Sequence, residues 1–206
     1  MNRHAMIKTL FKSLAAACLA ATLTACSAAS DQAAAQDPPL EGARIGGPFT
    51  LTDKDGNEVK WSDFDGKYRM VYFGYAYCPD VCPLDVQRMM QGYKGFAKSH
   101  PDLAKQVQPI FITIDPERDT PAVVGEFAAA FSDDLLGLTG TAEQVKKAAD
   151  AFSVYYQKGE VRDDGSYLMD HSRGAYLMGR EGEPIALLPV DQGGPQVAEE
   201  LEKWVH

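Results

Sequence analysis

Residues 70–83, MVYFGYAYCPDVCP, decide the fold expected for this chain. The run is apolar at nearly every position up to Tyr77, which predicts a central strand covered on both faces. Cys78 and Cys82 follow, and the residues after them have the apolar spacing of a helix. Two thiols about one helical turn apart, where a buried strand opens into a helix, suit soft-metal binding or dithiol chemistry.

The segments on either side of this run predict an α/β domain. Strands are expected at 48–52, 58–61, 67–75, 110–114, 153–158, 175–178 and 185–188, and helices at 84–98, 120–131, 141–152 and 195–205. Alternation of strands and helices favours a parallel core, and Asp55-Gly56 favours a hairpin near the start. Gly92 weakens the helix at 84–98. The order resembles the thioredoxin fold with an added N-terminal β-hairpin and an insertion before the final hairpin.

The first 25 residues predict a bacterial lipoprotein signal peptide. Three basic side chains precede an Ala- and Leu-rich run, 13–23, that is too short to span a bilayer. Leu23-Thr24-Ala25-Cys26 resembles a lipobox, in which Cys26 is lipidated and begins the mature chain. The alternative is an ordinary signal peptide or an uncleaved anchor with an incidental cysteine. Either way, the folded part is expected in the cell envelope, facing the periplasm and tethered to a membrane.

Composition divides the rest of the chain into a tether and one domain. Residues 26–41 hold almost no large apolar side chain, which is typical of a flexible tether. Residues 42–206 are enough for one domain with a real core, expected to be monomeric. The formal net charge is -9, and loss of the three basic side chains of the leader would take it to -12. This acidity argues against nucleic acid as a partner.

The cysteine count leaves one pair of thiols in the domain. Cys18 leaves with the leader and Cys26 is the expected lipid site, so Cys78 and Cys82 remain. An oxidising compartment allows a disulfide between them. A bridge so short in sequence restrains little of the unfolded chain, so a purely structural role explains the pair poorly.

Two prolines give the two thiols unequal settings. Pro79 favours an extended conformation at Cys78, and Pro83 suits the first position of a helix. Cys82 is then expected at the N-cap, where the helix dipole would lower its pKa below that of Cys78. Two such thiolates attract Cu(I), Zn(II) or Hg(II), or close to a disulfide.

A histidine is the natural third ligand, because two thiolates do not complete a structural zinc site. His206 ends the chain, and His100 lies in a predicted loop where it is expected to be solvated. His171 precedes the strand that begins the last hairpin, and in a thioredoxin-like fold this loop faces the cysteine helix. On residue type and fold alone, His171 stays open between a ligand and a surface histidine paired with Asp170.

Three motifs together carry a resemblance to a known family. They are the thiol motif with the Phe73-Gly74-Tyr75 that leads into it, the segment Asp115–Pro121 (DPERDTP) after the next core strand, and Asp170-His171-Ser172 before the last hairpin. A lone CxxxC would be a weak signal, but three motifs in this order and spacing are specific. They resemble the Sco/SenC family, the copper-binding proteins of cytochrome c oxidase assembly, over about 45–204.

The resemblance implies one copper ion, Cu(I) or Cu(II), held by Cys78, Cys82 and His171 and destined for the dinuclear copper centre of the oxidase. The residue chemistry agrees, since two thiolates and an imidazole suit Cu(I) and accept a further oxygen donor for Cu(II). Asp80 and Asp170 are candidates for orienting His171 or completing the ligand shell. Each is otherwise a solvated loop acid.

Three functions follow from these residues. The first is a copper metallochaperone, not an enzyme, whose partners would be the copper-centre subunit of the oxidase and other periplasmic copper chaperones. The second is a thiol-disulfide reductase, with Cys78 and Cys82 as its redox pair and a thioredoxin-like reductant as electron donor. The third is a peroxide sensor or peroxidase, disfavoured because no Thr or Arg constellation of the peroxiredoxin kind surrounds Cys78. His171 favours the first, because a pure oxidoreductase does not need it.

Overall fold

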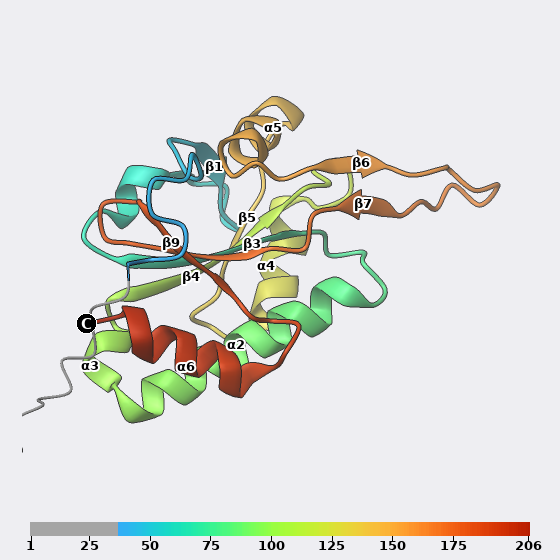
Figure 1. Cartoon of the computed structure of the whole chain (residues 1–206). Helices are drawn as coiled ribbons and strands as arrows, with labels where there is room; N and C mark the ends of the chain where they lie inside the picture. Colours follow the sequence, from blue (N-terminus) through green and yellow to red (C-terminus); the bar gives the residue numbers. More distant parts are fainter. Residues whose placement is uncertain (1–36) are drawn as a thin grey trace, which may run out of the picture. The chain divides into compact units, whose positions relative to one another are not determined.

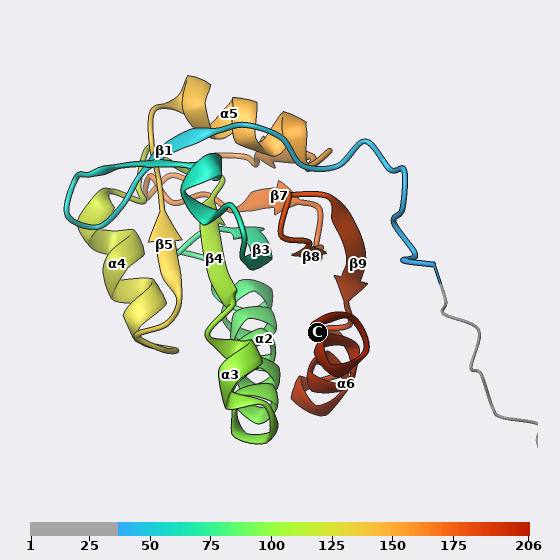
Figure 2. The same cartoon turned by 90° about the vertical axis from the view of Figure 1, so that its left-hand side faces the viewer.

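A five-stranded mixed sheet runs through residues 37–206, the part of the chain that the computed structural model describes (Figures 1 and 2). The order of its strands is β5-β4-β3-β8-β9. β5, β4 and β3 are parallel, β8 is antiparallel to β3, and β9 is antiparallel to β8. Their bounds are β3 Tyr68–Gly74, β4 Val107–Thr113, β5 Leu136–Leu138, β8 Ala175–Met178 and β9 Pro184–Leu188.

The central strand is β3, as its apolar sequence predicts. All seven of its residues are buried, and Tyr72 lies between Phe111 of β4 and Ala175 of β8. A strand covered on both faces has no solvated side on which polar residues would be favoured. The carboxyl end of β3 therefore delivers the thiol motif to the middle of the sheet edge.

Helices α2 (Val81–Ser99) and α6 (Gly194–Trp204) lie side by side on one face of the sheet (Figure 2). A Cβ atom at Gly92 of α2 would lie only 2.5 Å from the side chain of Val197 in α6. The glycine that lowers the helix propensity of this segment therefore permits the close approach of two helices. The short helix α3 (Pro101–Ala104) follows α2.

The opposite face carries α5 and the N-terminal hairpin (Figure 2). The expected capping box is present in α5, where Thr141 accepts from the Gln144 amide and Gln144 from the Thr141 amide. Phe152, which follows α5, packs on Trp61 and Phe73 at ring-centroid distances of 5.5 and 5.2 Å. The bounds here are α5 Ala142–Ala151, β1 Thr50–Thr52, β2 Glu58–Lys60 and a 3-10 helix, Trp61–Phe64.

Besides α3 and the 3-10 helix, two features of the fold were not expected from the sequence. The first is β5, which extends the parallel sheet and packs against α4 (Pro121–Ala129). The second is that the expected strand near residue 156 pairs with a partner. β6 (Tyr156–Lys158) and β7 (Met169–His171) form a hairpin that projects from the body (Figure 1). This hairpin lies in the predicted insertion and ends at His171.

The start of the chain is described only from residue 37. Contacts with the sheet begin at Leu40, whose amide donates to the Ile185 carbonyl of β9 at 3.0 Å, two residues before the predicted start of the domain. The predicted signal peptide and the lipidation site Cys26 lie outside the described residues. Within the described part, no helix has the length and apolarity needed to cross a membrane.

Candidate metal centre

The two thiols lie at the start of α2, close to the end of β3. The helix begins at Val81 with Asp80 as its cap residue, so Cys82 lies inside the first turn. The predicted N-cap position of Cys82 is therefore wrong by two residues, and Asp80 makes no side-chain capping bond. The Cys82 amide instead donates to the Cys78 sulfur at 3.4 Å. One of the free helix N–H groups is thus satisfied by a thiol.

The protonation of the pair is the reverse of the sequence-based prediction. Hydrogen bonds from the Cys82 thiol, from the amides of Asp80 and Cys82 and from the Tyr75 hydroxyl lower the pKa of Cys78 to about 5. The pKa of Cys82 is raised, because its proton is held by Cys78 and burial disfavours its charged form. Cys78 is therefore the thiolate, and the prediction that Cys82 has the lower pKa is wrong.

Both thiols are free and shielded from solvent to different degrees. Cys78 is 8% exposed and Cys82 is fully buried. Cys78 also lies on a hollow of about 380 Å³ at the surface, which Cys82 does not line. Any group that reaches the site from outside therefore meets Cys78 first.

The structure brings His171 to the thiols from a distant part of the chain. Its Nε2 atom lies 3.3 Å from the Cys82 sulfur. Its Nδ1 atom lies 2.8 Å from the Ser172 carbonyl oxygen, which can only accept, so Nδ1 carries the proton. Nε2 is then the nitrogen left for a ligand bond, and it lies on the side of the sulfur. This is the tautomer that a metal ligand needs.

Two tyrosines hold the imidazole in place. The rings of Tyr72 and Tyr75 meet the His171 ring edge-on, with centroids 6.5 and 6.1 Å apart. The sequence predicts both tyrosines as part of a buried strand, and Tyr75 also as part of the motif that leads into the thiols. Their place immediately before the thiol motif was the available signal, but strand periodicity alone does not show which of them reach the site.

The two candidate carboxylates lie at the site without touching the imidazole. Asp80 and Asp170 are exposed and line the same hollow as Cys78 and His171. Neither has a hydrogen bond to His171, whose orienting partner is the Ser172 carbonyl. Of the other histidines, His100 is exposed and lies 3.6 Å from Glu202, and His206 is exposed at the end of the chain.

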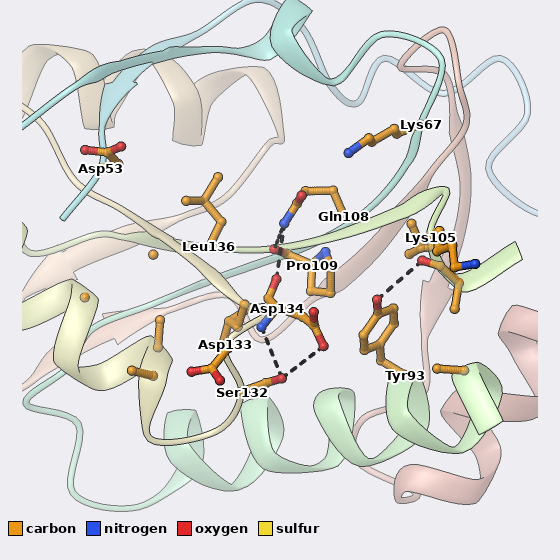
Figure 3. A pocket seen from close by; sticks show the side chains of 18 of the residues that line it. Asp53, Lys67, Tyr93, Lys105, Gln108, Pro109, Ser132, Asp133, Asp134 and Leu136 are labelled. Carbon is orange, nitrogen blue, oxygen red and sulfur yellow. Dashed lines mark hydrogen bonds between the residues drawn. The ribbon is translucent and has the colours of Figure 1, made fainter. Parts of the chain in front are cut away.

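Across residues 37–206, no three His, Cys, Asp or Glu side chains already converge as a metal-ligand set. The His171 Nε2 atom contacts the Cys82 sulfur, whereas the Cys78 sulfur accepts from the Cys82 amide. A metal held by all three side chains would have to bring them together. A larger hollow of about 900 Å³, bordered by β5 and residues such as Tyr93, Gln108 and Asp134, contains no cysteine or histidine (Figure 3).

The geometry can be compared with that of known proteins. A family model described as SCO1/SenC matches residues 37–206. The chain belongs to the SCO1/SenC family. The resemblance drawn from its motifs is therefore confirmed.

Relatives of this SCO1/SenC chain include proteins of distant organisms. The human protein named "Protein SCO1 homolog, mitochondrial" is 41% identical over 141 residues, which are 68% of this chain and 46% of that protein. The chain thus spans about half of the human relative's length. The structure of Bradyrhizobium japonicum ScoI with copper bound is 36% identical, with a TM-score of 0.70, over 78% of this chain and 99% of the other.

A copper-bound yeast Sco1 structure gives the same result. It is 36% identical with a TM-score of 0.70 and covers 78% of this SCO1/SenC chain and 88% of the yeast chain. These matches confirm the predicted thioredoxin-like α/β fold. They also show that related structures with this fold hold copper.

Proposed function

We propose that this chain is a copper metallochaperone that holds one copper ion through Cys78, Cys82 and His171. The observation that carries the proposal is the approach of the His171 Nε2 atom to 3.3 Å from the Cys82 sulfur, beside the Cys78 thiolate. Two sulfurs and one imidazole nitrogen form a soft donor set that suits Cu(I). The copper-bound relatives support the same metal.

Copper is the cargo in this proposal, and the residues of the chain decide how it is held. Cys78 offers an ionised sulfur at the surface hollow, whereas Cys82 must lose its proton when the metal binds. His171 would bind through Nε2, because its Nδ1 faces the Ser172 carbonyl oxygen. For Cu(II), Asp80 and Asp170 line the hollow where a further oxygen ligand would enter.

We further propose that the chain works in the bacterial cell envelope, facing the periplasm and anchored by a lipid on Cys26. Its partner would be the copper-centre subunit of cytochrome c oxidase, with other periplasmic copper chaperones as copper donors. The lipobox supports this setting. In such an oxidising compartment the thiol site needs reducing equivalents to stay open.

A second candidate function is reduction of disulfides, such as one formed by the oxidase copper-site cysteines. It is favoured by the ionised, partly accessible Cys78. The Cys78 sulfur would attack one sulfur of the target disulfide and release the other as a thiolate. Cys82 would then lose its proton and attack Cys78, which frees the target dithiol and leaves the Cys78–Cys82 disulfide. A thioredoxin-like reductant would restore the pair.

Copper titration of reduced protein tests the proposal. The wild type is expected to bind one copper per chain, and His171→Ala to weaken Cu(II) binding by at least about 10-fold, since even a ligand's neighbour typically costs that much. His100→Ala is the matched control, because His100 is exposed and does not lie at the dithiol. This variant should bind copper as the wild type does. Absence of copper from the reconstituted wild type would refute the metallochaperone, and equal binding by His171→Ala would refute the ligand set.

A further inference from the structure

A carboxylate on the cysteine helix is completely buried. Asp85, three residues after Cys82 in α2, has 0% exposure. A buried charge is costly unless it is paired and hydrogen-bonded. Asp85 is paired with Arg173, whose Nε and Nη2 atoms donate to the two carboxylate oxygens at 3.1 and 2.9 Å. This two-point geometry fixes direction as well as distance.

The position of Arg173 gives the pair its significance. Arg173 lies between β7 and β8, two residues after His171. The ion pair therefore ties residues 171–173, here called the histidine segment, directly to the cysteine helix α2. The other bonds of this segment run to the hairpin: the Ser172 amide donates to the Tyr155 carbonyl at 2.9 Å, and the Tyr155 amide to the Ser172 hydroxyl at 3.1 Å. The hairpin itself projects from the body (Figure 1).

A third element joins at the same carboxylate. The Tyr72 hydroxyl of β3 donates to Asp85 at 3.1 Å, and the Tyr72 ring is the one that meets His171 edge-on. Asp85 therefore connects the helix that carries Cys82, the strand that supports the imidazole, and the segment that follows His171. Each of these contacts bears on where the imidazole lies relative to the sulfur.

We propose that Asp85 and Arg173 form a clamp that positions His171 at the dithiol before any metal arrives. The proposal rests on the function proposed above, in which His171 is a ligand. Neither residue is itself a ligand in it. The clamp keeps the histidine segment in its binding-competent place, and a site that is competent only part of the time binds more weakly by that fraction.

Variants must separate loss of the clamp from loss of the fold. Arg173→Met removes the clamp but leaves the Asp85 charge buried without a salt-bridge partner, which can unfold a protein. The double variant Asp85→Asn/Arg173→Met removes both charges and so avoids that cost. Glu117→Gln is the matched control. Glu117 pairs with Lys158 at 2.6 Å and fastens the same hairpin to the body from an exposed position away from Arg173.

The first measurement uses the reduced, metal-free protein. Hydrogen exchange at the Ser172 amide is expected to be about 10-fold faster or more in the single and double variants, the size expected when hydrogen bonds to a charged group are lost. Arg173→Lys, which keeps the charge but not the two-point geometry, should lie between them and the wild type. Glu117→Gln should stay within about twofold, because exposed ion pairs contribute little.

The second measurement is Cu(II) affinity, expected to fall about 10- to 100-fold in the clamp variants. Faster Ser172 exchange together with weaker copper binding, with the control unchanged, supports the clamp. Unchanged Ser172 exchange in both folded clamp variants overturns it, whatever happens to copper. If the wild type binds no copper, the proposed function fails, while the exchange data on the metal-free protein still decide whether the clamp holds the segment.

Discussion

The most discriminating prediction concerns the thiol that ionises first. Folding lowers the pKa of Cys78 from 9.0 to about 5, and the largest cause is the hydrogen bond from the Cys82 thiol. Cys82→Ala is therefore expected to raise the pKa of Cys78, and Cys82→Ser to raise it less, because a hydroxyl still donates. Tyr75→Phe should have a smaller effect, since its hydroxyl is a minor donor to the same sulfur.

The size of the effect on reactivity depends on pH. Near pH 7, Cys78 would hold about 100-fold more thiolate than an ordinary thiol of pKa 9.0, but a thiolate of lower pKa is a weaker nucleophile by about 60-fold over this range. The two effects nearly cancel, to about twofold. Near pH 5.5 the thiolate ratio rises to about 2,400-fold, so Cys78 should react about 40-fold faster than an ordinary thiol.

The assay is the rate of reaction with an aromatic disulfide reagent from about pH 4 to pH 9. Metal-free, reduced protein is used, and digestion with mass spectrometry assigns the reaction to each cysteine. In the wild type, the reaction rate of Cys78 should rise with pH and reach its plateau while the pH is still acidic. An inflection above about pH 7.5 at Cys78, or faster reaction at Cys82, would refute the reasoning.

Three further predictions concern stability. Because the pKa of Cys78 is lowered on folding, its ionisation stabilises the reduced protein above the unfolded-state pKa, and this gain is lost as pH falls from 9.0 through about 5. The difference in urea midpoint between wild type and Cys78→Ser should therefore shrink over this pH range. A difference that stays constant with pH would contradict this. Gly74→Ala would place a Cβ 2.9 Å from the Tyr72 ring and 3.3 Å from the Cys82 sulfur, so urea unfolding should show a loss of about 1–3 kcal/mol; an unchanged midpoint would argue against this crowding. Phe152→Ala removes a ring of 0% exposure from the aromatic cluster and should cost about 3–5 kcal/mol, with a loss under about 1 kcal/mol counting against that packing.

Much of the fold followed from local pattern. The apolar run of β3, the Thr-Pro start of α4 and the capping box of α5 each predicted an element that the structure contains. β5 was not predicted, because Leu136-Gly137-Leu138 is three residues long and has a glycine at its centre. That glycine is explained only by α4, because a Cβ there would lie 2.6 Å from the Val124 carbonyl oxygen.

The thiol motif shows where local reasoning fails. The two prolines correctly indicated unequal settings for Cys78 and Cys82, but the helix begins earlier than they suggested. Which thiol ionises depends on donors from both sides of the motif, among them the Tyr75 hydroxyl and the Cys82 thiol. Their directions are set by the turn and by packing, so sequence spacing could not rank the two pKa values.

The sequence alone determined the family and the fold class, because motif order and hydrophobic period are local properties of the chain. Through the family resemblance it also named the three residues proposed as copper ligands. The tertiary structure decided how those residues meet. It placed His171 against Cys82 and made Cys78 the thiolate. It also showed that the Ser172 carbonyl, and not Asp170, orients the imidazole. The first outcome depends on a contact between residues 89 positions apart, Cys82 and His171, and the other two depend on near neighbours whose directions packing sets. Such contacts exist only when the strands and helices have packed.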